Sequence, residues 1–235
     1  MQANRTALIT GASQGFGLAL AQELAERGWQ LLINGRNAER LLTAYNQLSN
    51  TTKVVAISGD VRDEIHLLQL RNALRDNNWQ LDLVVNNASA LGTSPLSNLL
   101  EHPVDNLHEL YHTNIIAPLS LLQKVKAYFK PETKIINLSS DAAVEAYAGW
   151  GAYSSSKAAL DHLSAILAQE QPELRVYAFD PGDMRTSMHQ AAFPGEDISD
   201  RPLPKRTAIP AVLRLIEESL DSGRYAAGQL LAALA

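Results

Sequence analysis

The chain has 235 residues, 46% of them hydrophobic, which suits one folded α/β domain and excludes a disordered chain. A formal net charge of -5 gives no basic surface for nucleic acid, and the absence of cysteine excludes disulfides, thiolate metal sites and a cysteine nucleophile. No apolar run approaches ~18 residues and no charged leader with an apolar core comes first, so the sequence predicts a soluble, cytoplasmic protein without a membrane segment.

Strand-like and helix-like segments alternate along the chain. The expected strands are Thr6–Thr10, Gln30–Asn34, Lys53–Ser58, Leu81–Asn86, Lys134–Leu138 and Arg175–Phe179. The expected helices run from a Gly-rich turn to about Gly28, over Ala38–Leu48, Asp63–Arg75 and Asp105–Phe129, and through Tyr153 to about Gln169. This alternation predicts βαβ units, and therefore a single domain, residues 1–235, with a doubly wound parallel sheet (Rossmann fold) in three layers, α/β/α.

Two segments near the end of the chain depart from this alternation. Residues 187–206 contain three prolines, one glycine and no periodic pattern, which is typical of a mobile loop over a substrate. The segment after Gly228 is short and apolar, and we expect a last strand there.

The first strand leads into Thr10-Gly11-Ala-Ser13-Gln14-Gly15-Phe16-Gly17. Glycines between a strand and a helix allow a tight turn and bring backbone N–H groups close to a pyrophosphate, which the helix N-terminus attracts. An ordinary strand–helix turn is the alternative. The position directly after the first strand favours a dinucleotide site.

The second strand is followed by Arg36, where a carboxylate for the ribose of NAD would stand. An arginine matches a 2′-phosphate in charge and geometry, which favours NADP; a solvated surface arginine is the alternative. Asp60 and Asn86-Asn87-Ala88 end the next two strands, and they could bind the same ligand or cap helices.

Tyr153 and Lys157 are four residues apart on an expected helix, so they share one face. A cation beside a phenol lowers its pKa, which makes the phenol a better proton carrier near neutral pH. Ser140 lies thirteen residues before the tyrosine. An exposed pair on a surface helix is the alternative, and only a cofactor site nearby would exclude it.

A competing motif is His108-Glu-Leu-Tyr-His112, which fits the H-E-x-x-H pattern of zinc proteases. A catalytic zinc needs a third protein ligand, and none is indicated. We therefore expect no metal site, and we interpret both histidines as exposed or at an interface.

Together these motifs resemble those of the short-chain dehydrogenase/reductase family. The glycine turn matches TGxxxGxG, Asn86-Asn87-Ala88-Ser89 is similar to NNAG, and Tyr153-Ser-Ser-Ser-Lys157 matches YxxxK. Pro181-Gly182 is similar to the family's PG motif, with Thr186 beyond it. Ser89 replaces the family's glycine, a change that could alter the pocket wall.

The resemblance implies a catalytic tetrad of Asn114, Ser140, Tyr153 and Lys157. Tyr153 would transfer the proton, Ser140 would hold the carbonyl oxygen, Lys157 would lower the phenol pKa and hold the nicotinamide ribose, and Asn114 would hold a water. The implied NADP(H) contacts are Gly11, Ser13, Gln14, Gly15, Phe16, Gly17, Arg36, Asp60, Val61, Asn87, Ala88, Tyr153, Lys157, Pro181, Gly182, Met184 and Thr186.

The sequence therefore predicts an NADP(H)-dependent oxidoreductase that interconverts a carbonyl and a secondary alcohol by hydride transfer. We expect it to reduce a small, partly apolar ketone or dicarbonyl, because the expected pocket contains Tyr147, Trp150, Met184 and Met188. Trp150, Met184, Met188 and Phe193 could form a substrate wall or ordinary core. The alternative is a non-catalytic NADP-binding regulator on the same fold. The resemblance also implies a homodimer or homotetramer.

Overall fold

The computed structural model describes residues 5–232 as seven strands, nine α-helices and short 3-10 and π-helical turns. The strands are β1 (Thr6–Ile9), β2 (Gln30–Gly35), β3 (Val54–Ser58), β4 (Leu81–Asn86), β5 (Phe129–Leu138), β6 (Arg175–Asp180) and β7 (Gly223–Ala226). The helices are α1 (Gly15–Glu26), α2 (Ala38–Leu48), α3 (Glu64–Asp76), α4 (Val104–Tyr111), α5 (Ala117–Val125), α6 (Gly151–Glu170), α7 (Ser187–Ala192), α8 (Ala208–Glu217) and α9 (Ala227–Ala232).

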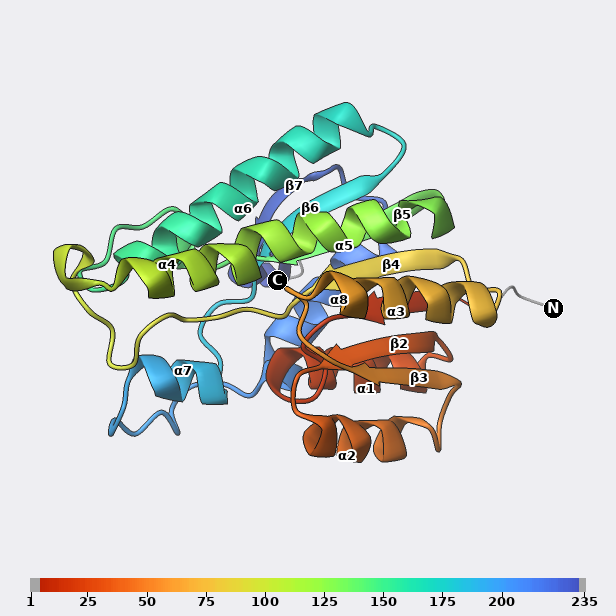
Figure 1. Ribbon diagram of the computed structural model, residues 1–235, viewed down its shortest axis with the longest axis horizontal. Coiled ribbons are helices and arrows are strands. Elements are labelled where there is room, and N and C mark those ends of the chain that lie inside the picture. Colours follow the sequence, from red (N-terminus) through yellow and green to blue (C-terminus); the bar gives the residue numbers. More distant parts are fainter. Residues whose placement is uncertain (1–4, 233–235) are drawn as a thin grey trace.

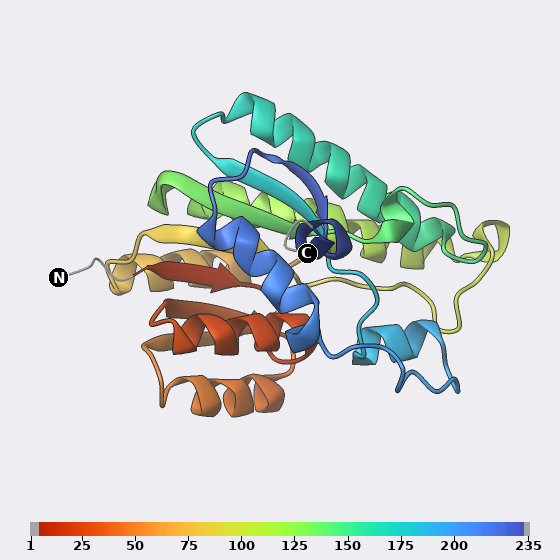
Figure 2. The same cartoon turned by 180° about the vertical axis from the view of Figure 1, so that it is seen from behind.

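The strands form one sheet in the order β3-β2-β1-β4-β5-β6-β7, and every neighbouring pair is parallel. Helices cover both faces of this sheet (Figures 1 and 2). One core joins the sheet to α1, α2 and α8, and a second joins it to α3 and α5. The expected doubly wound sheet in three layers is thus confirmed.

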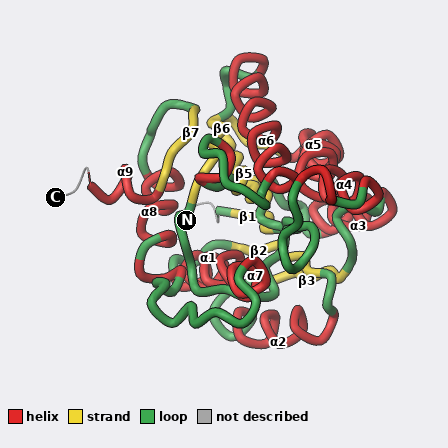
Figure 3. Tube along the Cα trace, turned by 90° about the vertical axis from the view of Figure 1, so that its left-hand side faces the viewer, coloured by secondary structure: helices red, strands yellow, loops and turns green. Residues whose placement is uncertain are grey.

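The chain order of the strands reverses between β1 and β4, which lie side by side in the sheet. The segments that follow both strands leave the sheet at its carboxyl edge. A crevice opens at such a reversal because the following chain segments run to opposite faces of the sheet. In Figure 3 the helices lie on either side of the strands, and α7 lies beyond the strand ends. The fold therefore gathers the ends of β1, β4, β5 and β6 at one edge.

The helix expected over residues 105–129 is found from Val104 to Val125, with a π-helical turn inside it, and the expectation is wrong at its end. The structure has α4, a π-helical turn at His112–Ile116, α5 and a 3-10 turn, and β5 already begins at Phe129. We attribute the π-helical turn to Pro118, which lies in the first turn of α5. Proline has no N–H to donate, and its ring displaces the carbonyl four residues earlier, which is that of Asn114.

The end of the chain also differs from expectation. Residues 187–206 are not wholly irregular, because Thr186 caps α7 by accepting a hydrogen bond from the His189 N–H at 3.2 Å. The last strand is β7, which precedes Gly228, and the apolar residues after it form α9. Leucine and alanine are strong helix formers, which accounts for this difference. Residues 233–235 of the expected strand lie outside the described part of the chain.

Candidate active site

The glycine turn after β1 leads into a helix N-terminus that no side chain caps. Gly11 and Gly15 have φ of +66° and +58°, a left-handed conformation that glycine adopts without a Cβ clash. α1 begins at Gly15, and no side chain caps it and no acidic residue lies in its first turn. The first N–H groups of a helix have no partner inside the helix, so this turn is suited to bind an anion.

Asn87 at the end of β4 fixes the shape of this turn. Its side-chain Nδ2 donates to the carbonyl oxygens of Thr10 and Gly11 at 2.8 and 3.0 Å. A Cβ added to Gly17 would lie 2.5 Å from the same Nδ2 and 2.6 Å from the Gly11 oxygen. Only glycine fits at position 17, and the close packing of α1 on the turn depends on it.

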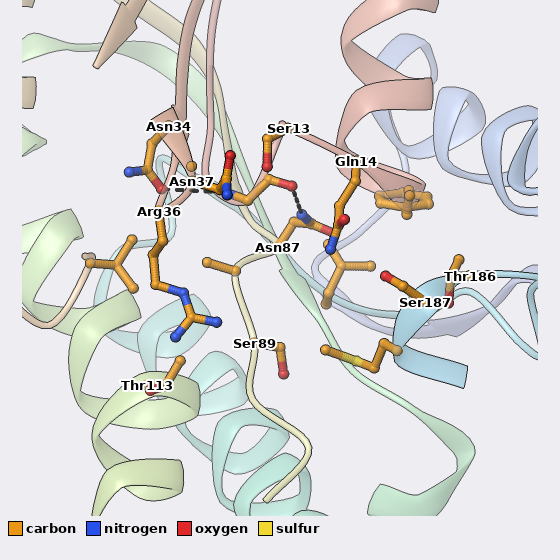
Figure 4. A pocket seen from close by; sticks show the side chains of 18 of the residues that line it. Ser13, Gln14, Asn34, Arg36, Asn37, Asn87, Ser89, Thr113, Thr186 and Ser187 are labelled. Carbon is orange, nitrogen blue, oxygen red and sulfur yellow. Dashed lines mark hydrogen bonds between the residues drawn. The ribbon is translucent and has the colours of Figure 1, made fainter. Parts of the chain in front are cut away.

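A cavity at the carboxyl edge of the sheet collects most of the expected cofactor residues (Figure 4). The expected residues that line it are Gly11, Ser13, Gln14, Gly15, Phe16, Arg36, Asp60, Val61, Asn87, Ala88, Tyr153, Lys157, Pro181, Met184 and Thr186. Gly17 lies beneath the glycine turn, and Gly182 lines an adjoining cavity instead.

Arg36 and Arg40 place two guanidinium groups beside the glycine turn. Arg36 makes no hydrogen bond or ion pair with any residue between 5 and 232, so its charge is available to a ligand. Arg40 donates to the Gln14 side chain at 2.9 Å. Sequence reasoning missed Arg40, although Asn37 caps α2 and thereby places Arg40 in its first turn.

Asn34 is a second cavity residue that the sequence reasoning missed. Its side-chain oxygen accepts from the Gly11 N–H at 3.4 Å, and its Nδ2 donates to the Gly59 carbonyl at 2.9 Å. It thereby ties the glycine turn to the segment after β3. No spacing signal could have identified it, because a buried asparagine inside an apolar strand serves this purpose only in three dimensions.

Asp60 follows β3 and is paired within the protein. Its carboxylate accepts from Arg62 Nε and Nη2 at 3.2 and 2.8 Å. The hydrogen bonds from the Arg62 guanidinium hold the pKa of the Asp60 carboxyl below its usual range. The carboxylate is therefore ionised at neutral pH, and it lines the cavity as expected.

A smaller cavity adjoins the first, and Tyr153 lines both. Ser140, Asp141 and Trp150 line only the smaller one, together with Leu91, Asp180, Gly182, Asp183, His189 and Ala192. The ring centroids of Trp150 and Tyr153 are 5.8 Å apart, and those of Trp150 and Phe193 are 5.9 Å apart. Aromatic residues therefore form one wall beside the phenol.

The pKa of Tyr153 differs from the expectation that Lys157 lowers it. Burial raises the pKa of the phenol well above its ordinary value, and the Asp141 and Asp180 carboxylates raise it further. Side-chain interactions with the Ser140 and Ser89 hydroxyls act in the opposite direction. The expectation considered a nearby cation but not the loss of water around the phenol, which dominates here.

Lys157 is 2% exposed, and its Nζ donates to the Leu138 carbonyl at 2.6 Å. The same Nζ lies 5.5 Å from the centre of the Tyr153 ring. Burial lowers the pKa of Lys157 to about 8, against a smaller raising effect of Asp161. The amine is therefore still mostly protonated at neutral pH.

Ser140 lines the smaller cavity, whereas Asn114 lies outside both cavities. The Ser140 hydroxyl donates to Asp141 Oδ1 at 2.8 Å and lines the smaller cavity. Asn114 lines neither cavity. Its Nδ2 donates to the Ala90 carbonyl and to Ser156 Oγ, each at 2.9 Å, while its oxygen accepts from Ser89 Oγ and Ala90 N. The Asn114 side chain therefore fastens the loop after β4 to α6.

The histidine motif at His108 to His112 spans the end of α4 and the start of the π-helical turn. Within residues 5–232 no group of three or more His, Cys, Asp or Glu side chains could hold a metal ion. In the same part of the chain no helix is long and apolar enough to cross a membrane.

Comparison with known sequences shows similarity to NADP-dependent reductases. The short chain dehydrogenase family model matches residues 5–197. Sepiapterin reductase of Mus musculus is 31% identical over 199 residues, 79% of this chain and 76% of that protein. A probable NADP-dependent dehydrogenase of Haemophilus influenzae is 35% identical, covering 82% and 77%. An NADPH-dependent pterin aldehyde reductase of Arabidopsis thaliana is 29% identical, covering 91% and 88%.

Comparison with solved structures also shows similarity to short chain dehydrogenases. A short chain dehydrogenase of Shigella flexneri complexed with NADP superimposes with a TM-score of 0.87 at 28% identity, covering 95% of this chain and 97% of that one. A short chain dehydrogenase of Escherichia coli complexed with NADPH gives 0.86 at 27% identity, covering 95% and 96%. The chain belongs to the short-chain dehydrogenase family and is an NADP-dependent oxidoreductase of that family.

Proposed function

We propose that this protein is an NADPH-dependent reductase of a small, partly apolar ketone or dicarbonyl, with Tyr153 as its proton donor. The observation that carries the proposal is the position of Tyr153 between the two cavities. One cavity is suited to the dinucleotide, and the other is suited to a substrate. A phenol at their junction can reach the oxygen of a carbonyl whose carbon faces the nicotinamide.

The cavity fits the charge of NADP. The uncapped N-terminus of α1, which follows the glycine turn, matches a pyrophosphate. Arg36 and Arg40 line the cavity beside this turn and match a 2′-phosphate. When bound, NADPH supplies the hydride, and the protein supplies position and electrostatics.

The buried phenol suits the reductive direction. Because burial and two carboxylates raise the pKa of Tyr153, the phenol carries its proton throughout the neutral range. It donates this proton to the carbonyl oxygen as negative charge develops there. Ser140 donates a hydrogen bond to the same oxygen after turning from Asp141, and the Lys157 ammonium stabilises the phenolate that remains.

The smaller cavity indicates the substrate class. Leu91, Trp150, Met184 and Met188 give it apolar walls, and neither lysine nor arginine lines it. This lining disfavours substrates that carry phosphate or carboxylate groups. Two relatives are named for sepiapterin and for pterin aldehydes, so a carbonyl attached to a flat, neutral ring is the first class to test.

The test is NADPH oxidation, followed by absorbance, against sepiapterin, a pterin aldehyde, small aliphatic ketones, dicarbonyls and their phosphorylated or carboxylated analogues. We expect turnover with neutral carbonyl compounds and at least ~10-fold lower kcat/KM with the anionic analogues. Equal turnover of the anionic analogues would contradict the proposed substrate class. Turnover of none of these carbonyls would contradict the reductase itself.

Three further expectations belong with this function. Residues 187–206, including α7, would close over the substrate, since Met188, His189 and Ala192 line the smaller cavity.

A homodimer or homotetramer would cover the exposed apolar side chains of Ile116 and Ile166. Light scattering coupled to size exclusion tests the assembly. A cytoplasmic location stays a prediction.

A further inference from the structure

Arg224 on β7 joins three chain segments next to the proposed catalytic groups. Its Nε donates to Asp161 Oδ2 at 2.9 Å, and its Nη2 donates to the Ser140 carbonyl at 2.9 Å. The same Nη2 reaches Asp180 Oδ2 at 3.2 Å. Asp180 in turn accepts from the Gly182 N–H through Oδ1 at 2.9 Å. One guanidinium therefore fixes the ends of β5 and β6 and the middle of α6.

Asp161 is the member of this cluster that faces Lys157. The two residues are four apart on α6, so their side chains share one face of the helix, one turn apart. The side chains of Asp161 and Asp180 are only 14% and 9% exposed, so water screens their charges weakly. The second oxygen of Asp161, Oδ1, is buried and forms no direct hydrogen bond within residues 5–232. Burial raises the pKa of the Asp161 carboxyl, and the nearby Ser139 hydroxyl, Arg224 and Lys157 act in the opposite direction.

Charged groups reach this region from every neighbouring element. The Asp161 carboxylate and the neutral phenol of Tyr153 come from α6, Arg224 from β7 and Asp180 from β6. The 3-10 turn after β5 adds the Asp141 carboxylate, and β5 contributes the Leu138 carbonyl to the Lys157 amine. Of these groups, Asp161 raises the pKa of Lys157, and burial lowers it. Arg224 neutralises part of the carboxylate charge and holds Asp161 in its place.

We propose that Asp161, held by Arg224, is a positioning residue that keeps the Lys157 amine in its charged form. The functional consequence rests on the proposed reductase, in which the ammonium stabilises the Tyr153 phenolate. Without the Asp161 carboxylate, the buried amine would have no opposing charge from its own helix. It would then lose its proton at a lower pH.

The direct test is the titration of Lys157 in the protein without NADP. Lysine labelled with 13C at Cε reports the protonation of each amine by NMR, and Lys157→Arg identifies the signal. In Asp161→Asn we expect the titration midpoint to fall by about one pH unit, a roughly 10-fold change in the acid dissociation constant. Glu170→Gln removes an exposed carboxylate from the same helix and should leave the midpoint unchanged.

Two variants separate charge from shape. Asp161→Glu keeps the charge and should keep most of the wild-type midpoint. Asp161→Ser, with a smaller neutral side chain, replaces Asp161→Asn if thermal unfolding shows that the latter does not fold. An unchanged midpoint in the neutral variants, or an equal shift in Asp161→Glu, would overturn the proposal.

Kinetics provide the second readout. With a reducible substrate, the alkaline limb of the kcat profile should move to lower pH in Asp161→Asn by the same amount as the NMR midpoint. A shifted NMR midpoint in a protein that reduces no carbonyl would contradict the proposed function and leave the electrostatic role of Asp161 standing. A shifted midpoint with an unmoved alkaline limb would contradict its part in the reaction.

Discussion

At the scale of single residues, we expect the choice of cofactor to depend on two arginines that line the larger cavity. Arg36 has no partner within the described residues, and Arg40 is held by Gln14 at the edge of the same cavity. A charge-assisted hydrogen bond contributes about 1.5–3 kcal/mol, so Arg36→Ala should weaken NADPH binding roughly 10- to 100-fold. NADH binding should change little, because NADH has no 2′-phosphate.

Fluorescence titration of both cofactors checks this prediction. Arg40→Ala should act in the same direction. Arg75→Ala serves as the control, because Arg75 is an exposed arginine on α3 that pairs only with the neighbouring Asp76. Equal weakening of NADPH and NADH in Arg36→Ala would refute a contact with the 2′-phosphate.

Several site residues could be predicted from the sequence because local spacing determines their position. The glycine turn, Arg36 and the Tyr153–Lys157 pair each lie at a strand end or on one helix face, and the structure brings them to one cavity. Asn34 and the Asp161–Arg224 pair could not be predicted, since they meet across distant segments. The direction in which the pKa of Tyr153 is shifted also depends on burial, which is a property of the tertiary structure.

At the scale of elements, the π-helical turn between α4 and α5 determines where Asn114 lies. The π-helical turn contains Asn114, and its side chain bonds to Ala90, Ser89 and Ser156. The spacing of apolar residues predicted the helix here but not the π-helical turn inside it. Pro118 was the available signal, because proline removes one helical hydrogen bond.

Replacing Asn114 by alanine should therefore loosen the loop after β4. It leaves the Ala90 N–H, the Ala90 carbonyl and the Ser89 hydroxyl without this partner, at a cost of about 3 kcal/mol in the free energy of unfolding, while the Ser156 hydroxyl keeps its bond to the Tyr153 carbonyl. Urea denaturation measures this loss. Asn46→Ala, at an exposed position on α2, should change stability by less than about 0.5 kcal/mol. Wild-type stability in Asn114→Ala would show that these bonds contribute nothing.

At the scale of the whole molecule, burial of the Lys157 amine lowers the free energy of unfolding near neutral pH. A fall in its pKa from 10.5 to about 8 corresponds to roughly 3 kcal/mol. The unfolded chain binds more protons than the folded one between these values. The penalty is therefore full below about pH 8 and disappears as the pH rises through 10.5.

Lys157→Met should accordingly stabilise the protein by about 2 kcal/mol near neutral pH, because it also loses a hydrogen bond to Leu138 of about 1 kcal/mol. The gain should shrink as the pH rises above about 8. Urea denaturation at several pH values checks both expectations. A variant less stable than the wild type near neutral pH would contradict the assigned burial cost. Reductase activity should be lost in either case.

The most direct test of the proposed chemistry is Tyr153→Phe, which removes the phenol oxygen and keeps the ring against Trp150. Tyr147→Phe is its matched control, since Tyr147 is exposed and its hydroxyl donates only to Asp141. The measurement is kcat for carbonyl reduction beside the Kd for NADPH. We predict that kcat falls at least about 100-fold in Tyr153→Phe while Kd stays within about 2-fold of the wild type. Wild-type turnover in Tyr153→Phe would contradict the account.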